Sequence, residues 1–431
     1  MGSRPEAQGV GTVQHLVVAG QGYVGLPLAV EAVRAGHVVV GYDVDERKIA
    51  SLERGTSYIA DIDSETLSEI VRTGRYTPSS HCREMKGFDV AIITVPTPLR
   101  DGDPDLSHIE SVAETVGRFL ERGRRQTVVL ESTTYPGTTR DVLVPILERV
   151  SKLTAGVDFH VGFSPERIDP GNGTWSFRNT PKIVSGLRDE CLRRVAEFYG
   201  SVCDDVVTAR GLEEAELAKV MENTFRHVNI ALVNELAAFA DELGIDVWHT
   251  LDLAATKPFG YMKFTPGPGV GGHCLPIDPA YLAWHVKKQV GRPFRFVETA
   301  NEINRAQPRY VVERLTRLLN SRRMPVNGAK VLMYGYAYKK DSSDHRESPA
   351  IEIHALLKGL GATVDVVDSF VAGQGIEDVQ GAIGPDRISQ YDVALIVTDH
   401  SDIDYEKVVR DSKLVLDTRN VGCAADHVEL L

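Results

Sequence analysis

The first part of the chain alternates short apolar runs with amphipathic stretches and glycine turns. Residues 15–19 are an apolar run, residues 20–25 are glycine-rich, residues 26–35 have helical spacing and end at Gly36, and residues 37–42 are apolar again. A strand, a tight turn, a helix and a second strand in this order form a βαβ unit.

The same alternation continues to about residue 205. We predict further strands at residues 90–94, 127–131 and 160–163, with helices between them. Alternating strands and helices are typical of a parallel sheet that carries helices on both faces. The pattern therefore predicts an α/β fold with a doubly wound sheet.

A long helix is predicted after Gly211, because residues 212–243 contain neither Gly nor Pro and are rich in Ala, Glu and Leu. Its apolar positions recur every three or four residues but cover more than one narrow face. They include Leu217, Val220, Met221, Val228, Leu232 and Leu236. Such a helix is expected to bridge two domains or to pack against a second subunit. We therefore predict a helical dimerisation region and a homodimer or higher homo-oligomer.

The alternation of strands and helices returns near Lys330 and echoes the first unit. The predicted elements are a strand at 331–334, a turn at Gly335, a helix at 349–359, a strand at 363–367 that ends in Asp368, and strands at 393–397 and 414–416. The fingerprint glycines of the first unit are missing here. We expect a second Rossmann-like domain that binds something other than an intact dinucleotide. A ligand is expected between the two sheets, at the carboxyl ends of their strands.

Composition narrows the class of protein. A chain of 431 residues is too long for one hydrophobic core and suggests about three units. Its formal net charge of −12 argues against a nucleic-acid partner, because neutralising phosphates requires a basic face. No apolar run approaches the roughly 20 residues of a membrane span, and the N-terminus lacks the apolar core of a signal peptide. We therefore expect a cytoplasmic protein without a membrane partner.

The 5 cysteines are odd in number and irregularly spaced, which predicts reduced thiols rather than a disulfide framework. No Cys-x-x-Cys or His-x-x-x-His pair is present, so no metal site is expected.

A dinucleotide fingerprint lies in the first turn. Gly20-x-Gly22-x-x-Gly25 follows a predicted strand and opens a predicted helix, where the glycines let the backbone approach a pyrophosphate. Asp43 ends the next strand, where a carboxylate can accept hydrogen bonds from ribose hydroxyls. The alternative is a plain turn and a solvated strand end. Because an acid repels a 2′-phosphate, we predict NAD; Lys48 and Arg47 nearby keep NADP as the alternative.

One thiol stands in a glycine-rich loop. Residues 267–279 read Gly-Pro-Gly-Val-Gly-Gly-His-Cys-Leu-Pro-Ile-Asp-Pro, with the thiol at Cys274 and a carboxylate at Asp278. A hydride acceptor and a positioned thiol together indicate a four-electron dehydrogenase. An alcohol would be oxidised to an aldehyde, captured as a thiohemiacetal, oxidised again and hydrolysed to a carboxylate. The alternatives are a buried structural cysteine and, for Asp278, an ordinary helix N-cap before Pro279.

Other candidates have weaker patterns. Lys219 and Asn223 are four residues apart on one face of the long helix, which by itself is more typical of solvated surface. Lys339 and Arg346 follow the first C-terminal strand, where surface charge and contact with a diphosphate ligand both remain open. The acidic net charge of the chain makes such local cations more meaningful for an anionic ligand.

The ordered motifs of the chain resemble those of the UDP-glucose/GDP-mannose 6-dehydrogenase family over essentially its whole length. The motifs are Gly20-Gln21-Gly22-Tyr23-Val24-Gly25-Leu26-Pro27, Val95-Pro96-Thr97-Pro98, Glu131-Ser132-Thr133, Ser164-Pro165-Glu166-Arg167, Ala215-Glu216-Leu217-Ala218-Lys219 with Glu222-Asn223-Thr224, the Cys274 loop, and Asp344-His345-Arg346-Glu347-Ser348-Pro349. The resemblance implies oxidation at C6 of a nucleotide sugar to a uronic acid, with two NAD per catalytic cycle. It also implies a role in polysaccharide biosynthesis.

The resemblance implies four segments: a disordered tail at 1–14, an NAD-binding Rossmann domain at 15–210, a central helical dimerisation domain with the Cys274 loop at 211–320, and a C-terminal UDP-sugar-binding Rossmann-like domain at 321–431. The predicted fold class is therefore α/β, with two Rossmann-like doubly wound domains joined by a long central helix and a helical dimerisation region.

The resemblance also implies roles for single residues. Cys274 matches the catalytic thiol, and Lys219 and Asn223 match donors to the developing oxyanion. Asp278 matches a carboxylate that positions water or relays a proton. Glu166 and Thr133 match residues of water or proton handling and cofactor contact. The other matched positions are the cofactor contacts Tyr23, Val24, Lys48, Pro96, Thr97 and Arg346, and the substrate contacts Arg167, Phe264, Gly269, Gly271 and Lys339, to which Glu166, Lys219 and Asn223 also belong.

One departure bears on the substrate. UDP-glucose enzymes commonly carry Lys immediately before the aspartate, whereas this chain has Ile277. The segments 256–260, 266–269 and 166–172 look more like the branch that acts on UDP-N-acetylglucosamine, and UDP-glucose remains open. Two other functions also remain: a single-hydride NAD-dependent dehydrogenase of the hydroxy-acid type, and a nucleotide-sugar-binding protein without catalysis.

Overall fold

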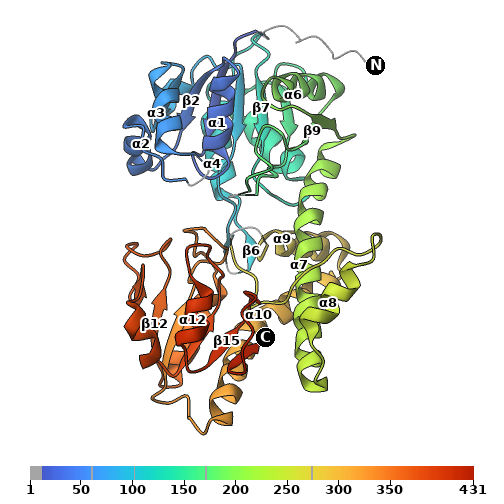
Figure 1. Cartoon of the computed structure of the whole chain (residues 1–431). Helices are drawn as coiled ribbons and strands as arrows, with labels where there is room; N and C mark the ends of the chain where they lie inside the picture. Colours follow the sequence, from blue (N-terminus) through green and yellow to red (C-terminus); the bar gives the residue numbers. More distant parts are fainter. Residues whose placement is uncertain (1–11, 60–61, 101, 170–171, 273–274) are drawn as a thin grey trace, which may run out of the picture. The chain divides into compact units, whose positions relative to one another are not determined.

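The computed structural model describes residues 12–59, 62–100, 102–169, 172–272 and 275–431. The chain divides into two compact units, residues 1–221 and residues 222–431. Each unit holds one large sheet with its own helices (Figure 1). Most of the predicted N-terminal tail lies outside the described residues.

An eight-stranded sheet forms the centre of the first unit. Its strands are β1 (His15–Ala19), β2 (Val38–Tyr42), β3 (Tyr76–Ser79), β4 (Val90–Ile93), β7 (Thr127–Leu130), β8 (His160–Phe163), β9 (Lys182–Gly186) and β10 (Val206–Thr208). The spatial order is β10-β9-β8-β7-β4-β1-β2-β3. A separate antiparallel hairpin consists of β5 (Leu99–Arg100) and β6 (Asp103–Pro104).

The prediction of a parallel sheet is confirmed except at one pair of strands. β9 runs antiparallel to β8, whereas every other neighbour in the eight-stranded sheet is parallel. The described residues between β8 and β9 include no helix. A parallel return would need a crossover connection of a dozen or more residues, usually a helix, whereas an antiparallel return does not.

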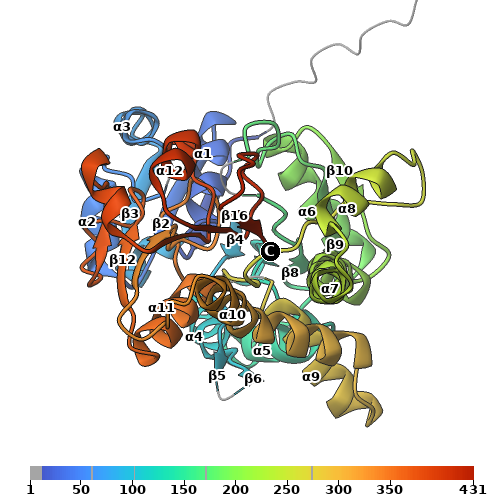
Figure 2. The same ribbon diagram turned by 60° about the horizontal axis from the view of Figure 1, so that its bottom comes forward.

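Helices cover both faces of this sheet. Figure 2 shows α1 (Gly25–Arg34) and α6 (Asp189–Val202) on one face, and α4 (Ser107–Gly117) and α5 (Val144–Ser151) on the other. Buried apolar side chains of β1, α1 and α6 belong to one cluster, which fixes these helices to the sheet. The doubly wound arrangement is thereby confirmed. The unit also contains α2 (Glu46–Glu53), α3 (Ser64–Arg72), η1 (Cys82–Met85) and η2 (Thr139–Leu143).

The turn between β1 and α1 requires glycine at two positions. Gly20 has φ +102°, and a Cβ atom there would lie 2.7 Å from the carbonyl oxygen of Thr94. A Cβ atom on Gly25 would lie 1.8 Å from the carbonyl oxygen of Gly20. The Gly20 N–H donates to the carbonyl of Tyr42 at 2.8 Å, which joins the turn to the end of β2. Sterics therefore fix the tight turn that the sequence predicts.

The long helix α7 (Leu212–Leu243) has the predicted bounds. Val220, Ala231, Val233, Ala237 and Ala240 are buried. A second set of apolar side chains recurs at intervals of three, four or seven residues and is exposed: Leu217, Met221, Phe225, Leu232, Leu236, Phe239 and Leu243. We name this second set the α7 stripe. The helix thus has a buried side within the chain and an exposed apolar side.

A six-stranded, wholly parallel sheet forms the centre of the second unit. Its strands are β11 (Lys330–Tyr334), β12 (Thr363–Val367), β13 (Val379–Gln380), β14 (Val393–Ile396), β15 (Val415–Asp417) and β16 (Val428–Leu430). The order is β13-β12-β11-β14-β15-β16. The second Rossmann-like fold predicted from the sequence is confirmed.

Two buried clusters lie on the two faces of this second sheet. α10 (Arg295–Ser321) and α11 (Pro349–Gly359) contribute to one cluster, and α12 (Tyr405–Asp411) contributes to the other. The remaining elements are α8 (Val247–Ala255), α9 (Asp278–Val290) and η3 (Pro385–Gln390). Across the described part of the chain, no helix combines the length and apolar character needed to cross a membrane.

Candidate active site

The N-terminus of α1 can accept an anion. Its N-cap residue, Val24, makes no side-chain cap hydrogen bond, and the first turn carries no acidic residue. A Cβ atom on Gly22 would have no described atom within 4 Å, so the space beside this glycine is open. Helix N-terminal amides and the positive end of the helix dipole favour a phosphate group here. The turn therefore fits the pyrophosphate of a dinucleotide.

Asp43 lies at the end of β2 beside this turn and is 8% exposed. Its Oδ2 atom accepts a hydrogen bond from the Gln21 N–H at 2.9 Å, and its Oδ1 atom accepts one from the Asp45 N–H at 3.0 Å. The Lys48 ammonium lies 3.4 Å from Oδ2. The predicted cofactor residues Asp43 and Lys48 are therefore paired, and Lys48 partly offsets the negative charge that disfavours a 2′-phosphate.

Gln21 supports the fingerprint turn, a role for which sequence reasoning offered no candidate. Its side chain is fully buried, and its Nε2 atom donates to the Val18 carbonyl at 2.8 Å. The hydroxyl of Tyr76 donates to Gln21 Oε1 at 2.7 Å, and the hydroxyl of Tyr58 donates to the Gln21 carbonyl at 2.5 Å. The amide side chain within the glycine fingerprint could have indicated this role. Its two tyrosine partners are distant in sequence and give no local pattern.

The loops that follow β4 and β7 are joined by side-chain hydrogen bonds. The Thr97 hydroxyl donates to the carbonyl of Thr133 at 2.9 Å, and the Ser132 hydroxyl donates to the carbonyl of Val95 at 2.7 Å. Both strands are parallel neighbours of the central sheet, so their carboxyl ends lie at one edge. The structure therefore brings together Pro96, Thr97 and Thr133, three of the predicted cofactor-contacting positions.

Glu166 follows β8 and is 8% exposed. Its Oε1 atom accepts a hydrogen bond from the Ile168 N–H, and its Oε2 atom lies 3.4 Å from the Lys182 ammonium. The neighbouring Arg167 donates from Nη1 to the Pro181 carbonyl at 2.8 Å. Both carboxylate oxygens of Glu166 are thus held, which gives this predicted catalytic group a defined orientation.

Lys182 connects Glu166 to a second buried carboxylate. Its ammonium lies 2.7 Å from Glu131 Oε1, and the Tyr199 hydroxyl donates to the same oxygen at 2.5 Å. Burial raises the pKa of Glu131 above its ordinary value, although the Lys182 charge opposes the shift. Burial lowers the pKa of Lys182, but Glu131 and Glu166 raise it by more. These directions are consistent with one charged ammonium shared by two carboxylates.

Glu216 on α7 holds the turn after the Thr133 loop. Its carboxylate accepts hydrogen bonds from the N–H groups of Gly137 at 2.6 Å and Thr139 at 2.8 Å, and from the Thr139 hydroxyl at 2.7 Å. Burial raises the pKa of Glu216 to about 7, although these hydrogen bonds oppose the shift. The sequence showed Glu216 only as a member of a motif and gave no role for it.

Lys219 and Asn223 lie one helical turn apart on α7 and are 9% and 7% exposed. They are therefore unlike the solvated helix surface that periodicity alone favoured. Asn223 Nδ2 donates to Asp278 Oδ2 at 2.5 Å. The side chain of Asn223 thus connects α7 to the first residue of α9.

The N-cap interpretation of Asp278 is wrong. α9 begins at Asp278 rather than Pro279, and its N-cap residue is Ile277, which makes no side-chain cap hydrogen bond. Asp278 is 4% exposed and directs its carboxylate to Asn223. A carboxyl group in such a buried, polar pair is suited to proton handling or to positioning a second group.

The glycine-rich loop before Cys274 packs closely on the segment that follows β11. The Gly272 N–H donates to the Arg346 carbonyl at 3.0 Å. A Cβ atom on Gly271 would lie 2.6 Å from Tyr338 Cβ, and one on Gly272 would lie 2.6 Å from Tyr338 Cζ. Only glycine allows this approach. His273 and the predicted catalytic Cys274 lie outside the described residues.

Buried amides hold the start of the same loop. Asn234 Oδ1 accepts from the Gly267 N–H at 2.9 Å, and Asn234 Nδ2 donates to Asn304 Oδ1 at 3.0 Å. Asn304 in turn donates to the His227 carbonyl at 3.2 Å. Sequence reasoning did not find these three residues, although polar side chains at buried positions of a long helix are a usable signal.

The predicted substrate residues of the second unit and the predicted cofactor contact Arg346 lie on described segments. Gly269 has φ +129°, and a Cβ atom there would lie 3.3 Å from the Asn304 carbonyl oxygen. The ring of Phe264 packs edge-on against Phe225 at a centroid distance of 5.8 Å. Lys339 is half-buried. Arg346 is exposed and forms a bidentate pair with Asp344, at 2.8 and 2.6 Å, so part of its charge is already matched.

Asp368 is a structural counterpart of Asp43. Its Oδ2 atom accepts from the N–H groups of Tyr336 and Ala337, at 2.7 and 2.8 Å, and from His400 Nε2 at 3.1 Å. Burial raises the pKa of Asp368, but these hydrogen bonds outweigh it and hold the pKa below its ordinary value. Its carboxylate therefore holds the turn after β11 in place and is already engaged at the position where a ribose would bind.

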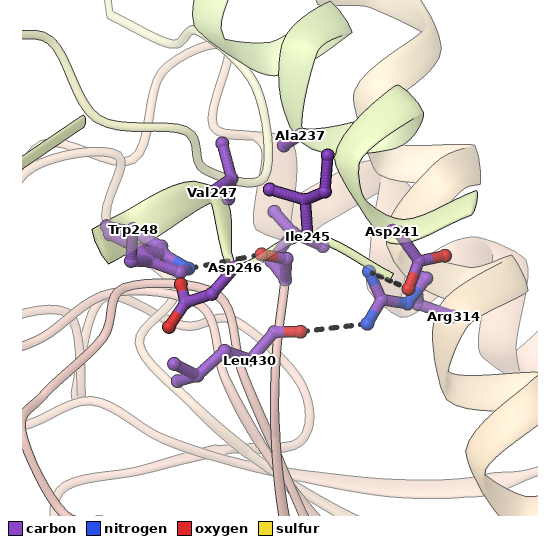
Figure 3. A pocket seen from close by; sticks show the side chains of 9 residues that line it. Ala237, Asp241, Ile245, Asp246, Val247, Trp248, Arg314 and Leu430 are labelled. Carbon is purple, nitrogen blue, oxygen red and sulfur yellow. Dashed lines mark hydrogen bonds and ion pairs between the residues drawn. The ribbon is translucent and has the colours of Figure 1, made fainter. Parts of the chain in front are cut away.

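A small cavity in the second unit is not the candidate site. Figure 3 shows Arg314 beside Asp241, with Trp248 and the end of the chain at the other side. Arg314 donates to the Leu430 carbonyl at 2.8 Å, and Trp248 Nε1 donates to the Leu431 carbonyl at 3.1 Å. The volume of about 130 Å³ is too small for a nucleotide sugar. This cavity lies where Arg314 and Trp248 hold β16 and the residue that follows it.

Within the described residues, no group of three or more His, Cys, Asp or Glu side chains could hold a metal ion.

A dinucleotide-binding Rossmann unit followed by a second Rossmann-like unit, with buried Lys, Asn and Asp side chains, defines a nucleotide-dependent dehydrogenase. Three family models match the chain: the NAD binding domain of the UDP-glucose/GDP-mannose dehydrogenase family at residues 14–202, the central domain at 213–306 and the UDP binding domain at 332–422. The chain belongs to the UDP-glucose/GDP-mannose dehydrogenase family and is an NAD-dependent oxidoreductase.

Similar proteins cover nearly the whole chain. The UDP-N-acetyl-D-glucosamine 6-dehydrogenase of Salmonella typhi is 37% identical over 390 residues, 89% of each chain. The UDP-N-acetyl-D-mannosamine dehydrogenase of Pyrococcus horikoshii is 33% identical over 415 residues, 94% of this chain and 95% of the relative. The solved UDP-glucose dehydrogenase of Pyrobaculum islandicum has a TM-score of 0.85 at 28% identity and covers 100% of this chain and 98% of its own.

Proposed function

We propose that the protein oxidises C6 of a UDP-hexose, UDP-glucose or UDP-N-acetylglucosamine, to the UDP-uronic acid in a four-electron reaction. The observation that carries this proposal is the buried pair of Asn223 and Asp278, joined at 2.5 Å, with buried Lys219 one helical turn away on α7. Asp278 follows Cys274 by four residues, so this polar group and the thiol belong to one short segment.

The first unit supplies the cofactor site. Gly20, Gly22 and Gly25 would admit the pyrophosphate at the N-terminus of α1, and Asp43 would accept hydrogen bonds from the adenosine ribose. Thr97 and Thr133 would hold the cofactor from the joined loops after β4 and β7. Bound NAD would supply the hydride acceptor, and a four-electron oxidation would consume two NAD in each catalytic cycle.

Residues of the chain carry the remaining chemistry. The Cys274 thiolate adds to the aldehyde carbon, and the thiohemiacetal becomes a thioester after the second oxidation. Lys219 and Asn223 donate hydrogen bonds to the oxyanion that develops at the reacting carbon. Asp278 relays the proton, and Glu166 positions the water that hydrolyses the thioester.

The second unit supplies the sugar-nucleotide site. The division into an NAD-binding domain at residues 15–210, a central helical dimerisation domain at 211–320 and a UDP-sugar-binding domain at 321–431 is part of this proposal. Phe264, Gly269, Gly271 and Lys339 contact the substrate, and Arg167 is a further proposed substrate contact. The names of the similar proteins and the presence of Ile277 favour a sugar with a C2 acetamido group. UDP-glucose remains the second candidate. We also retain cytoplasmic location and a role in polysaccharide biosynthesis as predictions.

We propose that the α7 stripe packs against a second copy of the chain. Leu232 is 59% exposed, Phe239 55% and Leu243 72%, and contiguous apolar exposure of this kind marks an interaction surface. Leu232→Lys combined with Leu236→Lys should convert the dimer to monomer in sedimentation. A wild-type protein that sediments as a monomer at micromolar concentration would contradict this part of the proposal.

NADH formation should be measured with UDP-glucose, UDP-N-acetylglucosamine, UDP-N-acetylmannosamine and GDP-mannose side by side. We expect turnover with a UDP-hexose, its loss in Cys274→Ala and its retention in Cys423→Ala. Binding of NAD and UDP-sugars without turnover would instead identify a nucleotide-sugar-binding protein. Full activity of Cys274→Ala would indicate a single-hydride dehydrogenase.

A further inference from the structure

The first unit contains a buried ionic cluster that the proposed roles leave unexplained. It consists of Glu131 after β7, Glu166 after β8, Lys182 at the start of β9 and Tyr199 on α6. Lys182 is 3% exposed and Glu131 is 0% exposed. Removing charges from water is costly, and such a cluster is weak evidence for stability by itself. Stability alone therefore does not account for this cluster.

The cluster contacts one group of the proposed mechanism directly. Lys182 Nζ lies 3.4 Å from Glu166 Oε2, while the Ile168 N–H holds the other oxygen of the same carboxylate. Lys182 is itself fixed, because Glu131 Oε1 lies 2.7 Å away and the rings of Phe177 and Tyr199 lie 4.8 and 5.1 Å from the ammonium. The ammonium therefore has little freedom to move away from Glu166.

We propose that Lys182 is a positioning residue that orients the Glu166 carboxylate and supplies the positive charge beside it during hydrolysis of the thioester. This inference rests on the proposed function. Glu131 and Tyr199 act through Lys182, since they hold its ammonium at the site.

The step that Lys182 supports is the hydrolysis of the thioester by one water molecule. A water oxygen bonds to the thioester carbonyl carbon while one of its protons passes to the Glu166 carboxylate. The C–S bond breaks, and its electron pair leaves on the Cys274 sulfur. The carboxylic acid so formed loses its proton to solvent, and Glu166 returns its own proton to solvent. Both oxidations precede this step, so no oxidant is required.

The test uses Lys182→Gln in the full chain. Because hydride transfer precedes hydrolysis, the variant should release a burst of two NADH for each active site and then turn over about 100-fold more slowly than wild type. Intact-mass measurement should show the sugar acyl group accumulating on the protein. The NAD dissociation constant should stay at its wild-type value, whereas the KM for the UDP-sugar should fall together with kcat, because the acyl-enzyme accumulates.

Rescue by a conservative variant gives a second readout. Lys182→Arg keeps a cation beside the Glu166 carboxylate. It should restore most of the activity and abolish the acyl adduct, whereas Lys182→Gln should retain the adduct.

Two further variants keep the result interpretable. Lys86→Gln removes an exposed lysine of the same unit and should leave activity unchanged. If Lys182→Gln fails to fold, Lys182→Met with Glu131→Gln removes both charges of the close pair and leaves an acceptor for Tyr199. This double variant should fold and should show the same slow hydrolysis.

The inference is overturned if a folded Lys182 variant turns over at the wild-type rate, or if the burst and the steady state slow equally without an acyl adduct. Failure of the proposed function has a different signature, because wild-type enzyme would then give no Cys274-dependent NADH from any UDP-sugar.

Discussion

Asn223 donates a hydrogen bond to the buried carboxylate of Asp278 at 2.5 Å, and this contact joins the long helix α7 to the first residue of α9. A short amide-to-carboxylate bond with both partners buried fixes both side chains. Two groups that the sequence placed 55 residues apart are therefore parts of one site.

Replacing Asn223 should affect catalysis more than binding. Asn223→Ala removes one proposed oxyanion donor and leaves Asp278 without its amide partner, so kcat should fall by about 10²–10³. NAD affinity measured by fluorescence should not change. Asn229→Ala is the matched control, because the Asn229 amide donates to the Phe225 carbonyl of the same helix. Equal effects of the two substitutions would show that Asn223 has no special role.

Substitutions of the fingerprint glycines should distinguish an effect on cofactor binding from an effect on stability. A Cβ atom on Gly22 meets open space, so Gly22→Ala should keep the wild-type melting temperature yet weaken NAD binding by about tenfold or more, or about 1.4 kcal/mol. A Cβ atom on Gly25 collides with the Gly20 carbonyl oxygen, so Gly25→Ala should also destabilise the protein by about 1–3 kcal/mol. Calorimetric melting and NAD titration check both. Unchanged NAD binding in Gly22→Ala would show that the pyrophosphate does not bind at this turn.

Glu216 should make stability depend on pH. The ordinary pKa of its carboxyl is 4.5, and burial raises the pKa to about 7 in the folded chain. Because the folded state keeps its proton longer, this contribution to stability is fully present below pH 4.5 and is lost as the pH rises to about 7. The loss amounts to about 3 kcal/mol at most.

Glu216→Gln cannot titrate, so its free energy of unfolding should vary less between pH 4.5 and 7 than that of wild type. Urea titrations across this range measure the difference. Glu213→Gln is the control, because Glu213 is only half-buried and its pKa is lowered by the hydrogen bond from Arg140. Parallel pH curves for wild type and Glu216→Gln would contradict the assignment.

The attachment of β16 should contribute to stability without affecting turnover. Trp248→Phe loses the hydrogen bond from Nε1 to the Leu431 carbonyl and should cost about 1 kcal/mol. Trp175→Phe, at a 52% exposed position, should cost less. Denaturant unfolding measures both, and kcat should stay at the wild-type value. A change in kcat without a change in stability would indicate a role for this cavity in catalysis.

Local patterns were sufficient to predict most of the fold. The bounds of β1, β8, α7, α11 and β12 agree with the sequence, because glycine, proline and clear periodicity mark where these elements begin and end. The antiparallel pairing of β9 was not predicted. Strand direction here depends on a connection without a helix, which carries no hydrophobic period.

The candidate site was only partly predictable. Motifs identified Asn223, Asp278 and Glu166, but their partners come from elements distant in sequence, as Lys182 does for Glu166 and Asn223 does for Asp278. Asp278 also shows how a local rule fails. An aspartate before proline favours an N-cap, yet the hydrogen bond to Asn223 directs the carboxylate elsewhere. Tertiary contacts decide between such alternatives.

The most direct test counts the NADH formed for each UDP-sugar consumed. Single-turnover measurement with excess enzyme, combined with chromatographic quantification of the acid, provides this ratio. A ratio of two, with the uronic acid as the product, is the result that we predict. A ratio of one, with the aldehyde as the end product, would contradict the four-electron mechanism.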